Sequence, residues 1–100
     1  MALKIRWSPQ AASNLEEICS YISKDSEYYA ALFAKRIIKI IKAIPDFPKL
    51  GRIVPEYNDK NLREKIYENY RIVYRIKEDI IEIAAICHGS RLLENILGPR

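Results

Sequence analysis

The start of the chain alternates apolar with basic side chains: Leu3, Lys4, Ile5, Arg6 and Trp7. A period of two is typical of a half-buried β-strand, because successive side chains point to opposite faces of a sheet. The alternation stops at Ser8-Pro9, where the serine can cap a first helical turn and the proline already has the helical φ. The pattern therefore predicts a strand over residues 3–7 and a helix that begins at Pro9.

Two segments of helical periodicity follow. In the first, which closes near Lys24, apolar residues recur every three or four positions: Ala11, Ala12, Leu15, Ile18, Cys19 and Ile22. The second begins after a capping Asp25 or Ser26 and ends at Pro45, and its apolar positions are Tyr29, Phe33, Ile37, Ile40, Ile41 and Ile44. Because this spacing places apolar side chains on one side of a helix, we expect an α-helical hairpin with two buried stripes.

The second half of the chain predicts a loop and then three strands. Residues 45–61 contain three prolines and one glycine, and a loop of this length is typical of a functional or partner-covered segment. The strand candidates, which turns at Glu68-Asn69 and Glu78-Asp79 connect, are residues 62–67, 70–77 and 80–88. The tail from residue 90 predicts one helical turn that stops at Gly98-Pro99.

These elements predict a single α+β domain over residues 1–100. Its N-terminal strand and α-helical hairpin precede a three-stranded antiparallel meander, and the helices are expected to pack on one face of the sheet.

A two-residue turn at Glu78-Asp79 sets the expected register of the last two strands. The expected pairs are Arg75 with Glu82, Val73 with Ala84, and Arg71 with Ile86. One face is then apolar and should receive the helices; it consists of Tyr70, Ile72, Tyr74, Ile76, Ile81, Ile83, Ala85 and Cys87. On the other face, His88 is expected diagonally across from Arg71, which has no acidic neighbour there.

The strand over residues 62–67 decides whether a cationic cluster forms on that outer face. We expect a three-residue loop after it, which places Ile66 inward opposite Tyr70 and turns Glu64 toward the core side. The outer face then gathers four cations and one histidine: Arg63, Lys65, Arg71, Arg91 and His88. Clustered charge of one sign favours an anionic ligand, while solvated edge arginines and a structural histidine are the alternative interpretation.

The amino-acid composition limits the classes of protein to which the chain can belong. The chain has 49% apolar residues, three glycines and a formal charge of +4, which suits a globular domain with an anionic partner and excludes a disordered chain. No apolar run reaches the roughly 20 residues of a membrane span, and no signal-like block follows the start, so we expect a soluble cytoplasmic protein. Cys19 and Cys87 lack metal-ligand spacing and are expected to be reduced core thiols, with no metal or cofactor.

Four short motifs occur between residues 48 and 91 of the chain: Pro48-Lys49-Leu50-Gly51-Arg52, Leu62-Arg63-Glu64, Tyr70-Arg71-Ile72-Val73-Tyr74 and His88-Gly89-Ser90-Arg91. In this order, and with the predicted elements, the chain resembles the RelE/ParE superfamily of type II toxin–antitoxin toxins, also called plasmid stabilisation proteins. The resemblance spans nearly the whole chain. It implies a toxin that a cognate RelB- or ParD-like antitoxin neutralises, and whose target is either ribosome-bound mRNA or DNA gyrase.

The nuclease branch of this superfamily implies a metal-independent site. On that interpretation, Arg71 and Arg91 would hold the scissile phosphate. His88 would protonate the leaving 5′-oxygen, and Glu56 would act as the base. The remaining candidates for binding nucleic acid or another target are Arg52, Arg63 and Lys65.

The gyrase branch is favoured by the end of the chain. RelE-like enzymes have a late tyrosine that stacks on a base, and Leu97 stands at about that position here. The ending from His88 to Arg91 resembles ParE-like members, which act through protein contacts. The hypothesis is therefore a toxin that inhibits growth by poisoning DNA gyrase. A RelE/YoeB-like mRNA endoribonuclease is the first alternative, and a degenerate toxin that serves as a non-catalytic peptide-binding module is the second.

Overall fold

The computed structural model describes residues 3–91 and 93–98. Its helices are α1 (Pro9–Ser23), α2 (Glu27–Ala43) and α3 (Glu94–Leu97), with the short 3-10 turns η1 (Ile44–Asp46) and η2 (Pro48–Leu50) after α2. Its strands are β1 (Lys4–Trp7), β2 (Arg52–Ile53), β3 (Leu62–Tyr67), β4 (Tyr70–Ile76) and β5 (Ile80–His88). The predicted hairpin, meander and C-terminal helical turn are confirmed, while β2 is an extra strand within the predicted loop.

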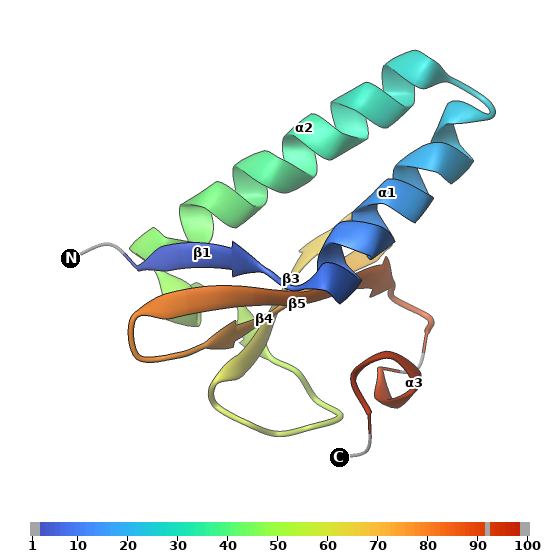
Figure 1. The fold of residues 1–100 in the computed structure, drawn as a ribbon. Helices are drawn as coiled ribbons and strands as arrows, with labels where there is room; N and C mark the ends of the chain where they lie inside the picture. Colours follow the sequence, from blue (N-terminus) through green and yellow to red (C-terminus); the bar gives the residue numbers. More distant parts are fainter. Residues whose placement is uncertain (1–2, 92, 99–100) are drawn as a thin grey trace.

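The five strands form one sheet in the order β1-β5-β4-β3-β2, in which β1 runs parallel to β5 and the other neighbours are antiparallel. Figure 1 shows α1 and α2 side by side over one face of this sheet and α3 away from them, near the C-terminal end of β5. The predicted α+β class, with the long helices on one sheet face, is confirmed.

Two serines fix where the long helices begin. The Ser8 hydroxyl accepts a hydrogen bond from the Ala11 N–H at 3.0 Å, and Ser26 accepts one from the Tyr29 N–H at 3.1 Å. Each such cap stabilises a helix by about 1 kcal/mol. Ser8 also donates to the Ala84 carbonyl at 3.0 Å, so the start of α1 is attached to β5.

The sheet is buried on both faces. Between the sheet and the long helices lies the main core, which we call the helix-side core: Ala11, Phe33, Ile37, Ile41, Ile44, Ile72, Tyr74, Ile81, Ile83 and Ile86. A second core covers the opposite face, where loop 54–61 and the C-terminal segment pack: Val54, Leu62, Val73, Ala84, Ala85, Cys87 and Leu93. Sequence analysis anticipated only the first of these cores.

A β-bulge changes the predicted pairing of β4 with β5. Close to their turn, Arg75 pairs with Glu82 as predicted, but the register shifts by one residue beside Val73. Val73 pairs with Ala85, and Ala84 is the extra residue on the bulged strand.

Beyond the bulge, every β5 side chain changes face relative to the prediction, because successive residues alternate across a sheet. Arg71 pairs with Cys87, so its predicted pairing with Ile86 is wrong. Ile86 belongs to the helix-side core, whereas Ala85 and Cys87 belong to the second core and not to the apolar face predicted for them.

The turn between β3 and β4 also differs from the prediction. Tyr67 pairs with Tyr70 across a two-residue turn, so the expected three-residue loop is wrong. Glu68 takes a positive φ of 53° in this turn, which a residue with a Cβ adopts only seldom. Ile66 therefore does not face Tyr70 but lies on the face of the second core, where 54% of its surface is exposed.

This turn length redistributes the charged residues of β3. Leu62 and Glu64 are buried on the face of the second core, so Glu64 turns away from the helices. Arg63 and Lys65 pair directly with residues of the helix-side core and so share its face. The predicted outer cluster is therefore wrong, because Arg63 and Lys65 lie on one face and Arg71 on the other.

Candidate functional site

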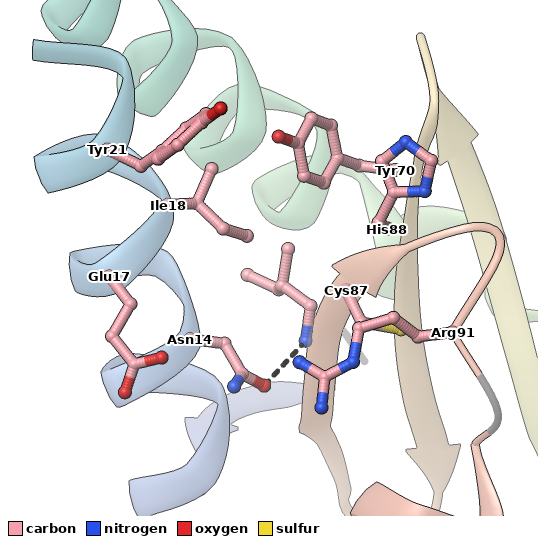
Figure 2. A pocket seen from close by; sticks show the side chains of 9 residues that line it. Asn14, Glu17, Ile18, Tyr21, Tyr70, Cys87, His88 and Arg91 are labelled. Atoms are coloured by element: carbon pink, nitrogen blue, oxygen red, sulfur yellow. Dashed lines mark hydrogen bonds between the residues drawn. The ribbon is translucent and has the colours of Figure 1, made fainter. Parts of the chain in front are cut away.

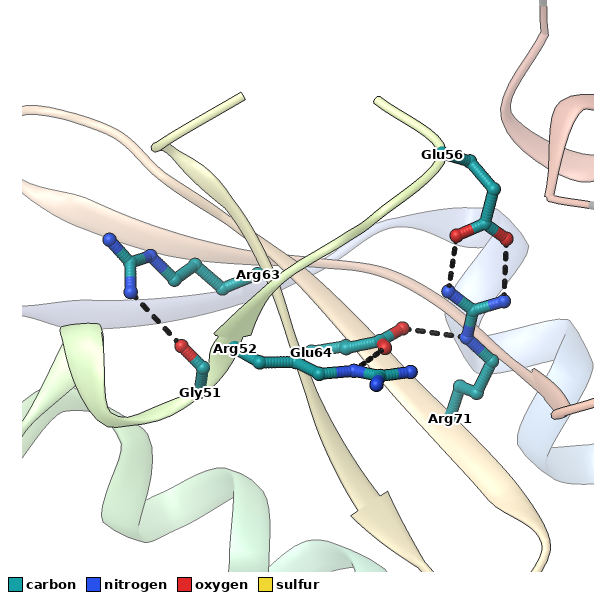
Figure 3. A network of polar contacts seen from close by, with 6 residues as sticks. All are labelled: Gly51, Arg52, Glu56, Arg63, Glu64 and Arg71. Carbon is teal, nitrogen blue, oxygen red and sulfur yellow. Dashed lines mark hydrogen bonds and ion pairs between the residues drawn. The ribbon is translucent and has the colours of Figure 1, made fainter. Parts of the chain in front are cut away.

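Arg71 is the centre of an ion-pair network on the face opposite the long helices (Figure 3). Its Nε donates to Oε1 of Glu64 at 2.6 Å, and its two terminal nitrogens donate to the two carboxylate oxygens of Glu56 at 2.7 and 2.8 Å. Arg71 is only 6% exposed, and Glu64 is 1% exposed. Two glutamates therefore hold this guanidinium in a buried position, and the prediction that it has no acidic neighbour is wrong.

The second oxygen of Glu64 extends the network to the sheet edge, where it accepts a hydrogen bond from Nε of Arg52. Arg52 comes from β2, Glu64 from β3 and Arg71 from β4. Glu56 comes from the loop between β2 and β3. Two arginines and two glutamates have a formal charge of zero together. This face consequently presents a balanced network instead of the predicted excess of cations.

The pKa values of the network residues move in the direction that keeps it charged. Hydrogen bonds from Arg71 are the largest cause that lowers the pKa of Glu56 to about 2, against an opposing effect of burial. The hydrogen bonds with Glu56 raise the pKa of Arg71 above its ordinary value, again against burial. A carboxylate with so low a pKa is a weak proton acceptor near pH 7, so this geometry does not prepare Glu56 to act as a general base.

His88 lies on a different face from Arg71, which corrects the predicted juxtaposition. It pairs with Tyr70 across β4 and β5, and the two rings meet edge to face with centroids 5.7 Å apart. Nδ1 of His88 accepts a hydrogen bond from the Ser90 N–H at 3.2 Å and lies 2.7 Å from the Ser90 hydroxyl. Ser90 therefore orients the imidazole in the turn that follows β5.

Arg63 is occupied by backbone carbonyl groups. Its Nε donates to the Lys60 carbonyl at 2.8 Å, and one terminal nitrogen donates to the carbonyls of Lys49 and Gly51 at 2.9 and 3.1 Å. The side chain thus holds the loop that carries β2 against β3. Lys65 lies two residues along β3 on the same face.

Three of the four predicted catalytic residues line two hollows at the same end of the sheet, and Glu56 is not in the lining of either. Arg71 and Arg52 line one of about 270 Å³, and Arg91 lines the other, of about 210 Å³, while His88 lies on the rim of both. Neither of these two hollows is lined by Arg71, His88 and Arg91 together.

The predicted strand register did not identify Glu64 as the partner of Arg71. The signal was available, because a two-residue turn at 68–69 places Glu64 opposite Val73 and therefore diagonal to Arg71. The prediction discarded that turn because it would expose Leu62 and Ile66 under a single core. The second core buries Leu62, so the objection does not hold for it.

Over residues 3–91 and 93–98, no group of three or more His, Cys, Asp or Glu side chains could hold a metal ion. Within the same residues, no helix is both long and apolar enough to span a bilayer.

Comparisons with known proteins agree with this architecture. Residues 5–93 match the family described as the ParE toxin of the type II toxin–antitoxin system parDE. A toxin candidate from Sinorhizobium fredii, Y4kP, is 33% identical over 96 residues, which cover 94% of this chain and 96% of the relative.

Three solved structures share the fold. A chromosomal ParDE system from P. aeruginosa has a TM-score of 0.72 at 20% identity, covering 87% of this chain and 96% of that one. The RelBE2 toxin–antitoxin complex from Mycobacterium tuberculosis has a TM-score of 0.64 at 14% identity, covering 88% and 99%. The YoeB dimer from Staphylococcus aureus has a TM-score of 0.55 at 24% identity, covering 88% and 97%.

Proposed function

Because the chain belongs to the ParE toxin family of type II toxin–antitoxin systems, we propose that this toxin arrests growth by poisoning DNA gyrase and not by cutting RNA. The family match covers 89 of the 100 residues, if the range 5–93 is counted inclusively. Membership establishes a toxin, and the choice of target is the proposal.

The observation that carries the proposal is the state of Arg71. A nuclease of the RelE type would need this guanidinium to stabilise charge on a phosphate, but three of its N–H groups already donate to Glu56 and Glu64. A phosphate would have to displace the Glu56 carboxylate, which forms a bidentate ion pair with the arginine through two hydrogen bonds. The low pKa of Glu56 also weakens it as a base for the 2′-hydroxyl. Both features support an action through protein contacts.

A cognate antitoxin is the second part of the proposal. The matched family is defined by a toxin–antitoxin system, and two of the structural neighbours are described as toxin–antitoxin systems or complexes. We expect a ParD-like antitoxin that binds this chain and suppresses growth arrest when the two are produced together.

The mRNA endoribonuclease remains the competing function, because Arg91 and His88 both reach the hollow of about 210 Å³. The Arg91 side chain makes no hydrogen bond or ion pair within the described residues. On this alternative, a phosphate binds there without Arg71. The endoribonuclease and the non-catalytic module predict different outcomes of the same experiment.

The experiment is a controlled induction of the chain in a bacterial host, followed by separate assays of growth, DNA and mRNA. We expect growth arrest, double-strand breaks and a DNA-damage response, with full-length messages throughout. In purified form, the chain should block supercoiling of relaxed plasmid by gyrase and trap linear DNA. Induction of a frame-shifted gene is the control for expression burden.

Each other outcome rejects the gyrase proposal in favour of a named alternative. Cleaved messages over intact chromosomes would identify the endoribonuclease. Undisturbed growth, with the folded chain present at the same level, would identify the non-catalytic module.

A further inference from the structure

The hollow of about 210 Å³ between α1 and the end of β5 has the features of a ligand site (Figure 2). Ile18 and Tyr21 line it from α1, and Tyr70, His88 and Arg91 line it from β4, β5 and the turn after β5. Tyr21 is 69% exposed, and Figure 2 shows its ring across the hollow from Tyr70. Tyr70 is half-buried, and aromatic side chains at a concave surface are typical of protein-recognition sites.

Asn14 supplies a hydrogen-bond donor at the base of the hollow. It is only 8% exposed, and its Oδ1 accepts a hydrogen bond from the Ile86 N–H at 3.1 Å. That bond orients the side-chain amide, so that Nδ2 is the atom left to donate. Within the described residues Nδ2 has no acceptor, although Asn14 lines the hollow.

Arg91 brings a second donor group to the same place. Figure 2 shows its guanidinium turned toward the Asn14 amide. Its own N–H donates to the His88 carbonyl at 3.0 Å, which closes the turn after β5 and positions the residue. Over residues 3–91 and 93–98, the guanidinium has no carboxylate partner, in contrast to that of Arg71.

The charged and polar groups that line the hollow indicate which class of ligand it binds. One guanidinium and one amide N–H₂ converge, which suits a carboxylate with its two acceptor oxygens. Glu17 lies on the wall of the same hollow, and its negative charge opposes the several charges of successive phosphates more strongly than the single charge of a carboxylate. The two tyrosines and Ile18 offer contact area to an apolar or aromatic group beside the carboxylate.

From this geometry we propose that the hollow is a carboxylate-binding site for an acidic peptide segment. An Asp or Glu side chain of a protein partner binds Arg91 and Asn14 Nδ2, and a neighbouring aromatic or apolar side chain packs between Tyr21 and Tyr70. The inference concerns binding by the isolated chain, so it does not depend on whether gyrase is the target.

The test uses a matched pair of small probes on the ¹⁵N-labelled full-length chain. N-acetylphenylalanine has a carboxylate beside an aromatic ring, and N-acetylphenylalaninamide has the same shape without the charge. NMR titration should give saturable shifts of the Asn14 side-chain N–H₂ and the Arg91 Nε–H with the acid. The amide should bind at least about tenfold more weakly, because a hydrogen bond to a charged group contributes about 1.5–3 kcal/mol.

Two variants and one control locate the site. Arg91→Gln and Asn14→Asp should each abolish the saturable shifts; the aspartate keeps the oxygen that accepts from Ile86 and removes the donor. Lys39→Gln removes the same charge from an exposed position of α2 and should bind the acid as the wild type does. Adenosine monophosphate is a third probe, for the competing nucleotide ligand.

Equal binding of acid and amide by the wild type would overturn the proposal without reliance on any variant. Shifts confined to residues outside the hollow would also overturn it. Tighter binding of adenosine monophosphate than of the acid at the same resonances would reassign the site to nucleic acid.

Discussion

Two arginines at the same end of the sheet have opposite surroundings. Arg71 is buried and shares three hydrogen bonds with Glu56 and Glu64, whereas Arg91 is exposed and lines an open hollow without an ion pair among the described residues. Both arginines belong to the single phosphate-binding cluster that was predicted from the sequence. The comparison teaches that the residue type does not assign a role, because the neighbouring carboxylates decide whether a guanidinium stabilises the fold or is available to a ligand.

The network around Arg71 explains why its disruption should be costly. Its members come from β2, β3, β4 and the loop after β2, so the ion pairs fasten the sheet edge to the loop. Removal of Glu64 or Arg71 leaves the other of the two buried without full compensation, whereas the Arg52 side chain is 60% exposed. Among residues 3–91 and 93–98, no carboxylate forms an ion pair with Arg91, so changes there should affect binding and not folding.

The largest effect is expected for Glu64→Ala, because Glu64 is fully buried between two guanidinium groups. We expect the free energy of unfolding in urea to fall by about 3 kcal/mol. Glu68→Ala, at an exposed turn position, is the matched control and should change it by less than about 0.5 kcal/mol. Equal effects of the two substitutions would contradict the structural role of the network.

Acid should break the Arg71 network through Glu56, whose pKa is about 2 in the folded chain against an ordinary value of 4.5. Because the folded pKa is depressed, the stabilisation is complete above about pH 4.5 and is lost as the pH falls toward 2. Partial solvent screening reduces the expected loss to about 2 kcal/mol.

Urea unfolding at pH 6 and at pH 2.5 measures this acid effect, and the Glu56→Gln variant is its control. That variant should start less stable at pH 6 and should lose less stability between the two pH values. The same pH dependence in both proteins would show that other groups cause it.

The C-terminal segment, which follows Arg91, should respond to a smaller change. Tyr57 donates a hydrogen bond from its hydroxyl to the Gly98 carbonyl at 2.6 Å, and so connects loop 54–61 to the end of α3. Tyr57→Phe should lower the free energy of unfolding by about 1 kcal/mol. Tyr28→Phe, at a residue that is 77% exposed, should have no measurable effect on stability in the same assay.

The smallest effect on stability is expected for Arg91→Gln. Without a carboxylate partner among the described residues, this side chain should contribute less than about 0.5 kcal/mol to the free energy of unfolding. Arg71→Gln should cost several times more, about 3 kcal/mol, since it leaves two glutamates without their shared cation. Similar values for the two variants would remove the distinction between the arginines.

The sequence predicted the helices and strands because their periodicity is local. Ser8-Pro9 and Pro45 mark helix ends, and the alternation in residues 70–76 and 80–88 marks strands. These features depend on neighbouring residues alone, so the order of elements and the fold class followed from them.

The candidate site could not be predicted in the same way, because it depends on register. The bulge at Ala84 moves Cys87 and His88 to faces other than those expected. No glycine or turn motif near Ala84 indicates the bulge in the sequence. Glu68 gives no sign of the positive φ that allows a two-residue turn. The second core, which buries Leu62 on the face away from the helices, needs contacts with Val54 and Leu93 that lie far away in the sequence.

The coupling between Arg71 and Glu56 tests the account most directly, and a double-mutant cycle of unfolding free energies measures it. The four proteins are the wild type, Arg71→Gln, Glu56→Gln and the double variant, at pH 7. A structural ion pair predicts that the double variant is more stable than the sum of the single effects implies, by about 2 kcal/mol. Additive effects would contradict the account, because Arg71 would then be free to bind a phosphate without losing a partner.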